Sequence, residues 1–286
     1  MEKICLFVTS SQPFELIDSF LESVERQSPH LYIDVVFVNQ NKNNYTGHKY
    51  RRDGELKIIE VNEVIPLSKA RNIAISNACL SNYNFIAFPD DDCWYSDGLL
   101  DNIVKFFRKN QGIDILCANV LDPSNNKTYG DRPRDSRILI SENNIFKYPI
   151  SVGIFIRMSD LINSQIYFDE QLGAGTKIGS GEETELIYRL LKKQFRCLYD
   201  GGIYVYHPVV DGKYCSNDIK KYFAYGVGFG FLCRKMICNK DFSVLIYYMY
   251  ILVRTLGGVL LNFDNNINRK VYISRFKGML VGILRR

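Results

Sequence analysis

The sequence predicts an α/β protein with a mostly parallel central sheet, helices on both faces, and a helical extension at its C-terminus. Up to about residue 208, short apolar runs of strand length alternate with segments of helical periodicity. Beyond about residue 212 the composition shifts to aromatic helices punctuated by glycine. We therefore expect a body of residues 1–211 and an extension of residues 212–286.

Apolar runs mark the expected strands of the first half, which are residues 4–8, 33–38, 56–61, 85–88 and 113–119. Between them, apolar side chains recur on one helical face in residues 14–27, in a segment opened by Pro66, and in residues 99–109. The first run stops at a Thr-Ser-Ser sequence, too early for a secretory signal. We expect it to be the first strand of a cytoplasmic protein.

The second half of the body is less regular. Residues 122–147 are polar and are expected to form a long loop, followed by a strand at residues 151–157. A glycine-rich stretch, residues 173–181, then leads into a helix at residues 182–193, and a strand at residues 204–208 closes the body.

The net charge of +5 is concentrated at the C-terminal end. Residues 234–286 hold ten Lys or Arg and two Asp or Glu, a net of +8, so the other 233 residues sum to −3 (5 minus 8). Long aliphatic and aromatic stretches separate these cations, which favours an anionic membrane surface over nucleic acid as the partner. The eight cysteines form no CxxC pair, as expected for free thiols in a reducing compartment.

One stretch of the extension, residues 242–263, has a single basic residue, Arg254, near its middle. A charge at that place makes crossing a bilayer costly, so an in-plane helix at the membrane surface is the favoured interpretation. The alternative is that this stretch packs against the body.

Three consecutive acids, Asp90, Asp91 and Asp92, follow the fourth predicted strand. Their mutual repulsion is relieved by a divalent cation, and carboxylate ligands suit Mg²⁺ or Mn²⁺, which can also bridge a diphosphate. The alternative is a solvated turn before the helix at residue 99. Thr9 and Asn39 also fall at strand ends, where ligands gather in parallel sheets.

Four short motifs follow one another in a characteristic order. They are Ala70-Arg71-Asn72, Asp90-x-Asp92, Phe168-Asp169-Glu170 and Gly181-Glu182-Glu183. In order and spacing they resemble the family 2 glycosyltransferases of the GT-A fold, over about residues 4–207. The resemblance implies inverting transfer of a sugar from a nucleotide-diphosphate sugar, UDP-linked above all, to an acceptor hydroxyl.

The resemblance also implies roles for the donor-side residues. The Asp-x-Asp aspartates of the family bind the ribose and the metal, which gives these roles to Asp90 and Asp92, with Asp92 as the direct metal ligand and Asp91 beside the donor. Arg71 would contact the nucleotide; the alternative for Arg71 is a surface salt bridge. Thr9 and Ser11, which follow the first strand, would also contact the nucleotide. Asn39 stands where the family usually carries an acid that reads uracil.

The remaining implied residues are the base and a third metal ligand. The family's catalytic acid falls on Glu183, but the pair here is Glu182-Glu183, so which glutamate acts stays open. The alternative for Glu183 is a helix capping box with Ser180 as N-cap. His207 stands where the family often completes the metal site, and its alternative is a structural histidine.

These assignments imply Mn²⁺ or Mg²⁺ as cofactor, a nucleotide-sugar donor, and a saccharide or lipid-linked acceptor. They place the chain on the inner face of the plasma membrane, in polysaccharide or glycolipid assembly. A nucleotidyltransferase and a catalytically degenerate membrane scaffold are the alternative functions. A dinucleotide oxidoreductase is disfavoured, because the first strand lacks the following glycines that a pyrophosphate requires.

Overall fold

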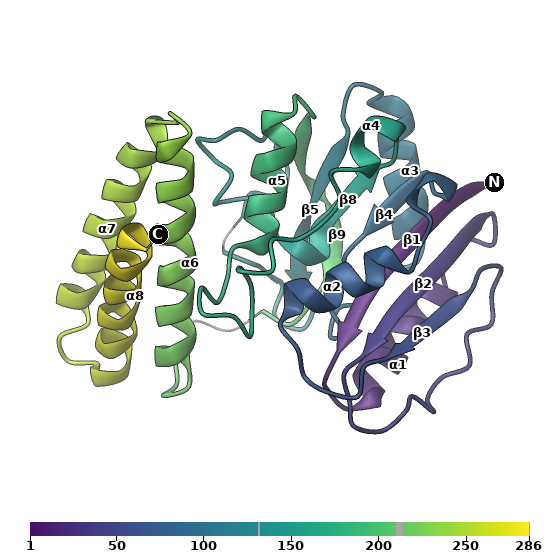
Figure 1. Cartoon of the computed structure of the whole chain (residues 1–286), viewed down its shortest axis with the longest axis horizontal. Helices are drawn as coiled ribbons and strands as arrows, with labels where there is room; N and C mark the ends of the chain where they lie inside the picture. The colour runs from purple at the N-terminus through teal and green to yellow at the C-terminus, as the bar shows by residue number, and fades with distance from the viewer. Residues whose placement is uncertain (131, 210–213, 286) are drawn as a thin grey trace. The chain divides into compact units, whose positions relative to one another are not determined.

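The structure is a computed structural model that describes residues 1–130, 132–209 and 214–285 (Figure 1). The chain forms two compact units. Unit 1 comprises Met1–Ile65, Lys69–Tyr167 and Leu186–Val209, and unit 2 comprises Pro66–Ser68, Phe168–Glu185 and Val210–Arg286. The boundary expected between residues 211 and 212 lies outside the described residues, so that division stays a prediction.

Unit 1 is built on one nine-stranded sheet with the order β3-β2-β1-β4-β8-β5-β9-β7, and β6 pairs with β5. The longer ladders, β1 with β2 and β5 with β9, are parallel, whereas β8 runs antiparallel to both β4 and β5. The mostly parallel sheet is therefore confirmed. The strands are β1 (Glu2–Ser10), β2 (Leu31–Asn39), β3 (Leu56–Glu60), β4 (Phe85–Ala87), β5 (Ile115–Asp122), β6 (Lys127–Thr128), β7 (Arg137–Leu139), β8 (Ile154–Arg157) and β9 (Cys197–Tyr206).

Helices cover both faces of this sheet (Figure 1). On one face, the alternate β1 residues Ile4, Leu6 and Val8 join a buried core with α1 (Phe14–Glu25) and α3 (Leu99–Lys109). On the other face lie α4 (Asp160–Asn163) and the unit 1 parts of two helices, α2 (Leu67–Ser76) and α5 (Glu182–Lys192). Strand alternation explains this arrangement, because successive side chains of a buried strand serve opposite faces.

The segment expected to be one long loop is more ordered than the sequence suggested. Residues 122–147 contain β6, which forms an antiparallel pair with β5, and β7, which borders β9. The last strand also begins earlier than expected, at Cys197, and continues through Gly201 and Gly202 across a register shift against β5. A Cβ on Gly201 would lie 2.2 Å from the Pro133 carbonyl oxygen, so the close approach of the chain at residues 133–134 requires glycine there.

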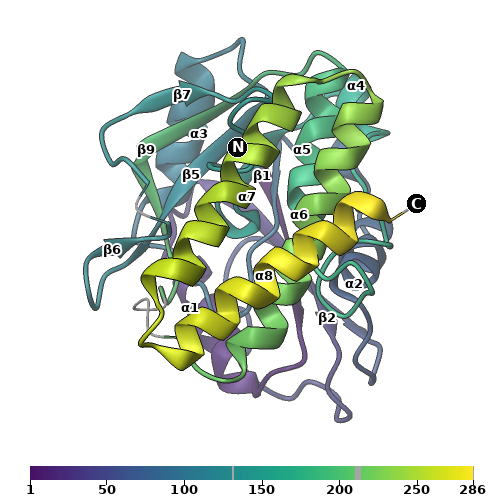
Figure 2. The same cartoon turned by 90° about the vertical axis from the view of Figure 1, so that its left-hand side faces the viewer.

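Unit 2 contains the glycine-rich stretch and three helices (Figure 2). These helices are α6 (Asp218–Cys238), α7 (Ser243–Leu261) and α8 (Asn266–Leu284). Helices α6 and α8 meet through glycines at Gly226, Gly230, Gly278 and Gly282, and a Cβ on Gly278 would lie 2.2 Å from the Phe223 carbonyl oxygen. Glycine here permits backbone-to-backbone contact between the two helices. The expected aromatic, glycine-punctuated helices are confirmed.

Candidate metal and donor site

The acid triplet and His207 come together because two distant segments pair just beside them. Trp94 forms an isolated antiparallel bridge with Tyr206, in which each backbone N–H donates to the other residue's carbonyl, at 2.9 and 3.1 Å. The residues before Trp94 therefore lie next to those after Tyr206. The sequence did not predict this bridge, since Trp94 lies outside every strand and a single bridge leaves no periodic pattern.

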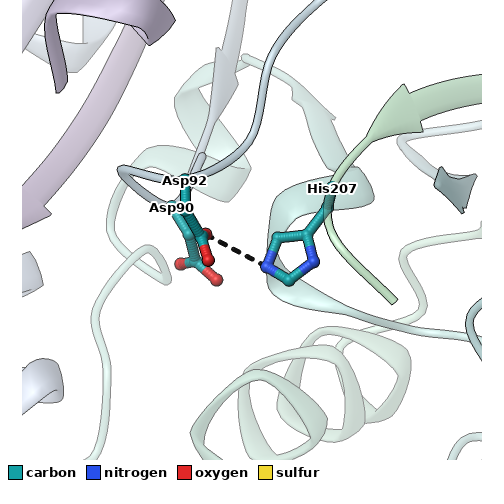
Figure 3. A group of neighbouring side chains, drawn as sticks. All are labelled: Asp90, Asp92 and His207. Atoms are coloured by element: carbon teal, nitrogen blue, oxygen red, sulfur yellow. Dashed lines mark ion pairs between the residues drawn. The ribbon is translucent and has the colours of Figure 1, made fainter. Parts of the chain in front are cut away.

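Asp90, Asp92 and His207 form a group that could hold a metal ion (Figure 3). One ligand atom of each lies within 4.8 Å of the others, and all three residues are partly buried. The Nε2 atom of His207 is 3.1 Å from Oδ1 of Asp92. Two carboxylates and an imidazole nitrogen at this spacing fit a divalent cation such as Mn²⁺.

The surroundings of His207 orient its ring for such a role. Its Nδ1 atom lies 2.6 Å from the Pro208 carbonyl oxygen, so a proton on Nδ1 leaves Nε2 facing the aspartates. Burial lowers the pKa of His207, but the hydrogen bond to Asp92 and the charges of Asp92 and Asp90 outweigh it and raise the pKa above its ordinary value. The aspartates thus favour positive charge at the position where a cation would bind.

Arg71 supplies another positive charge next to the triplet. Its Nη2 atom is 3.0 Å from Oδ1 of Asp90, and the residue is only 1% exposed on α2. Arg71 thus forms a salt bridge, but a buried one instead of the surface salt bridge of the alternative, and its contact with the nucleotide stays a prediction. A buried arginine held against a carboxylate is a rigid, permanent cation, suited to a phosphate or a base carbonyl.

Asp91 points to a different partner, the side chain of Ser10 at the end of β1. The Ser10 hydroxyl donates to Asp91, and burial raises the pKa of this carboxyl to about 6. Among the residues after the first apolar run, Thr9 and Ser11 were the predicted donor contacts, and Ser10 was not predicted. The alternation along β1 was the available signal, because it buries Ser10 while leaving Thr9 half-buried and Ser11 exposed.

Asn39 lies directly beside Ser10 in the parallel register of β1 and β2. Its side-chain amide is fully buried and donates to the Asn43 carbonyl oxygen at 2.9 Å and to Glu60 at 2.5 Å, while its oxygen accepts from the Asn41 N–H at 3.0 Å. These bonds organise the loop after β2. The amide therefore has a structural role at a place where the resemblance implied base recognition.

Glu182 and Glu183 open α5 and belong to unit 2. Gly181, with φ of +93°, immediately precedes the helix, and its carbonyl accepts from the Glu185 N–H at 2.9 Å. Gly181 thus occupies the N-cap position that the capping box would assign to Ser180, so the helix begins one residue later than that alternative requires. Glu182 is buried and Glu183 is partly buried.

Comparison with solved structures finds similar folds at low sequence identity. The mannosyltransferase PcManGT from Pyrobaculum calidifontis, solved in complex with GDP-Man and Mn²⁺, is 13% identical with a TM-score of 0.61, covering 98% of this chain and 87% of that one. Residues 1–349 of TarS from S. aureus are 17% identical with a TM-score of 0.54, covering 79% of this chain. The match spans 65% of that TarS chain and 40% of the longer TarS structure.

The sequence comparisons agree with the fold. No curated protein sequence matches the chain. The profile described as glycosyl transferase family 2 matches residues 8–168, which is more than half of the 286 residues and includes both the acid triplet and Arg71. The chain therefore belongs to glycosyl transferase family 2.

Proposed function

We propose that the protein transfers a sugar from a nucleoside diphosphate to an acceptor hydroxyl, with inversion at the anomeric carbon and with a divalent cation bound by Asp90, Asp92 and His207. The single observation that carries this proposal is the clustering of those three side chains beside a buried arginine. The bound ion would stabilise the charge that develops on the leaving diphosphate. The histidine ligand favours Mn²⁺ over Mg²⁺.

The donor side consists of residues at the carboxyl ends of β1, β2 and β4. Arg71 binds the nucleotide through its fixed guanidinium, and Asp91 stays next to the donor through its bond from Ser10. Thr9 and Ser11 flank that serine, and Asn39 shapes the loop against which the base lies. UDP is our first choice of nucleotide, and the GDP-Man bound to PcManGT makes GDP the first alternative to test.

On the acceptor side, Glu183 acts as the base that takes the proton of the attacking hydroxyl. A carboxylate at that point makes an otherwise poor nucleophile reactive as the bond to the anomeric carbon forms. Glu182 is the second candidate, and its burial makes it the better positioning residue. The acceptor is a saccharide or a lipid-linked saccharide at the cytoplasmic face of the plasma membrane.

The donor half of the proposal is tested by binding and slow hydrolysis of UDP-, GDP- and dTDP-sugars, with and without Mn²⁺. We expect one donor to bind in a Mn²⁺-dependent manner, and Asp92→Ala to weaken that binding by about 100-fold or more. Asp97→Ala is the matched control, since Asp97 is exposed and forms a surface ion pair with Arg26 at 3.4 Å. Equal binding in both variants would contradict the metal site, and turnover of a sugar 1-phosphate with a nucleoside triphosphate would favour a nucleotidyltransferase.

The base is tested by Glu183→Gln, with Glu182→Gln beside it, using short glycosides and prenyl-linked saccharides as acceptors. We expect Glu183→Gln to keep Mn²⁺-dependent donor binding and to lose transfer by about 10²- to 10⁴-fold, the usual contribution of a general base. Full transfer activity in that variant would refute the assignment, and loss confined to Glu182→Gln would move the role to Glu182.

A further inference from the structure

Helix α7 is apolar on two opposite sides. One side is buried and carries Val244, Tyr248, Ile251, Thr255 and Gly258, spaced three and four residues apart. The opposite side is exposed and equally apolar, and we call it the outer strip; its members are Phe242, Ile246, Met249, Tyr250, Val253 and Leu260. Ile246 is 75% exposed and Leu260 is 76% exposed, so this strip has no cover within the described chain.

The buried side of α7 is fixed to α8. The Tyr248 hydroxyl donates to the Met279 carbonyl oxygen at 3.2 Å, and the Thr255 hydroxyl lies 3.8 Å from the Met279 sulfur. At Gly258 a Cβ would lie 2.4 Å from the Tyr272 ring, so the helices touch there as well. Figure 2 shows both helices leaving the short turn that joins them. Helix α7 is therefore part of a packed helical unit.

This packing decides between crossing a membrane and lying on one. By length and composition α7 could span a bilayer, and it is the one helix in the described ranges that could. Crossing would either strip it from α8 or draw α8 into the hydrocarbon with its cations, which include Arg269, Lys270, Arg275 and Lys277. Both are costly, the second because each basic side chain loses hydration at depth. On α7 the side opposite α8, which carries the outer strip, is therefore the side available to lipid.

Basic groups surround the strip where headgroups would lie. Exposed Lys240 precedes α7. Exposed Arg254 is the residue directly after Val253, so it lies about 100° around the helix from the strip. At the other end the Arg269 guanidinium lies 4.9 Å from the centre of the exposed Phe263 ring. Two acids, Asp241 and Asp264, also lie near the ends of α7, so the three cations named here outnumber them. An apolar stripe with a net positive border is the pattern of an in-plane helix on an anionic leaflet.

We propose that the outer strip of α7 inserts into the surface of an anionic phospholipid bilayer, with α7 parallel to the membrane plane and the basic groups on lipid phosphates. The proposal names the partner of unit 2 and does not depend on the donor chemistry of unit 1. It places the reaction of the proposed function where a lipid-linked acceptor would be presented.

The test is flotation of the full-length protein with vesicles of phosphatidylcholine alone or mixed with phosphatidylglycerol. We expect binding to the anionic vesicles, and we expect alkaline carbonate to release the protein. A combined variant, Ile246→Ser, Val253→Ser and Leu260→Ser, should lower the partition coefficient on the order of 100-fold, given the apolar area withdrawn from lipid. The control combines Val64→Ser and Leu161→Ser, which are as exposed but lie in unit 1, and should bind like the wild type.

Three results would overturn the proposal: no flotation of the wild type, unchanged flotation of the strip variant, or resistance of the wild type to carbonate, which would mean spanning. A dimer that the strip variant converts to a monomer, with flotation unaffected, would assign the strip to a second copy of the chain. Circular dichroism verifies that the variants fold. Donor hydrolysis in solution is expected to be unchanged in the strip variant, so failure of membrane binding and failure of the proposed function are separate outcomes.

Discussion

The two units of the molecule use their polar and apolar residues in opposite ways. Unit 1 gathers charged groups at one edge of its sheet, where Arg71, Asp91 and His207 each have a defined partner. Unit 2 packs its helices through glycine and leaves a row of large apolar side chains on the outside. The first arrangement suits chemistry on a charged ligand, and the second suits contact with an extended apolar surface.

This difference decides how each unit tolerates change. In the site of unit 1 the partly or fully buried groups are charged or polar, so a substitution there acts through charge and its effect depends on pH. In unit 2 the critical contacts are between backbones, so a single added methyl group acts through sterics and its effect does not depend on pH.

The largest effect is expected from Gly278→Ala in unit 2. The new Cβ would lie 2.2 Å from the Phe223 carbonyl oxygen, so α6 and α8 must separate, which we expect to cost about 3 kcal/mol of unfolding free energy. Gly257→Ala is the matched control on α7, where nothing lies within 4 Å of the added atom, and it should stabilise by roughly 0.5–1 kcal/mol. Urea unfolding of both full-length variants measures the difference, and equal shifts would contradict the close packing.

A smaller change, an increase in the unfolding free energy, is expected from Asp91→Asn in unit 1. The pKa of Asp91 is raised from 3.8 to about 6 by burial, so the folded state holds this proton more tightly than the unfolded state does. Stability from this group is present at low pH and is lost as the pH rises through 3.8 to about 6. The variant should therefore have the same unfolding free energy as the wild type near pH 4. At pH 7 and above its unfolding free energy should be higher by about 2 kcal/mol, reduced by the solvent screening of this partly buried carboxyl.

Urea unfolding at several pH values, in EDTA, tests this prediction, because the difference between variant and wild type isolates Asp91 from the other carboxyls. A constant difference across the range would show that the Asp91 carboxyl titrates normally. A variant that is more stable yet binds donor more weakly is the expected exchange of stability for function at a ligand site.

Most of unit 1 could be predicted from sequence because its signals are local. The alternation of apolar runs specified the strands around β1, and the acid triplet and Arg71 belong to short motifs, whereas His207 was named only from its position in the family resemblance. What the sequence missed depends on pairing between distant segments. Neither the bridge from Trp94 to Tyr206 nor the bond from Ser10 to Asp91 has a periodic signature, although the bridge is what brings His207 to the aspartates.

The composition of unit 2 predicted its helices, but it did not predict which side of each helix is exposed. The sequence predicted apolar helices with a single charge near the middle of one of them, and this left two interpretations open: an in-plane helix at a membrane surface or packing against the body. In the structure one side of α7 is buried against α8, within the extension itself, and the other side is exposed, as Tyr248 and Ile246 show. A helix that is apolar all round has no strong periodicity, so only the packed structure separates its two sides.

The smallest predicted effect comes from Ser10→Ala, which removes the hydroxyl that donates to Asp91. That hydrogen bond lowers the carboxyl pKa against the larger effect of burial, so its loss should raise the pKa further above 6. Stability should be unchanged near pH 4 and should fall by about 1 kcal/mol at pH 8, because the folded state then ionises Asp91 without its donor. NMR titration of the carboxyl carbon measures the pKa directly, with Thr9→Val as the control at the neighbouring position. A pKa that falls or stays constant would mean that Ser10 does not stabilise the ionised form, and that burial and the charges of Asp92 and Asp90 set the pKa of this acid.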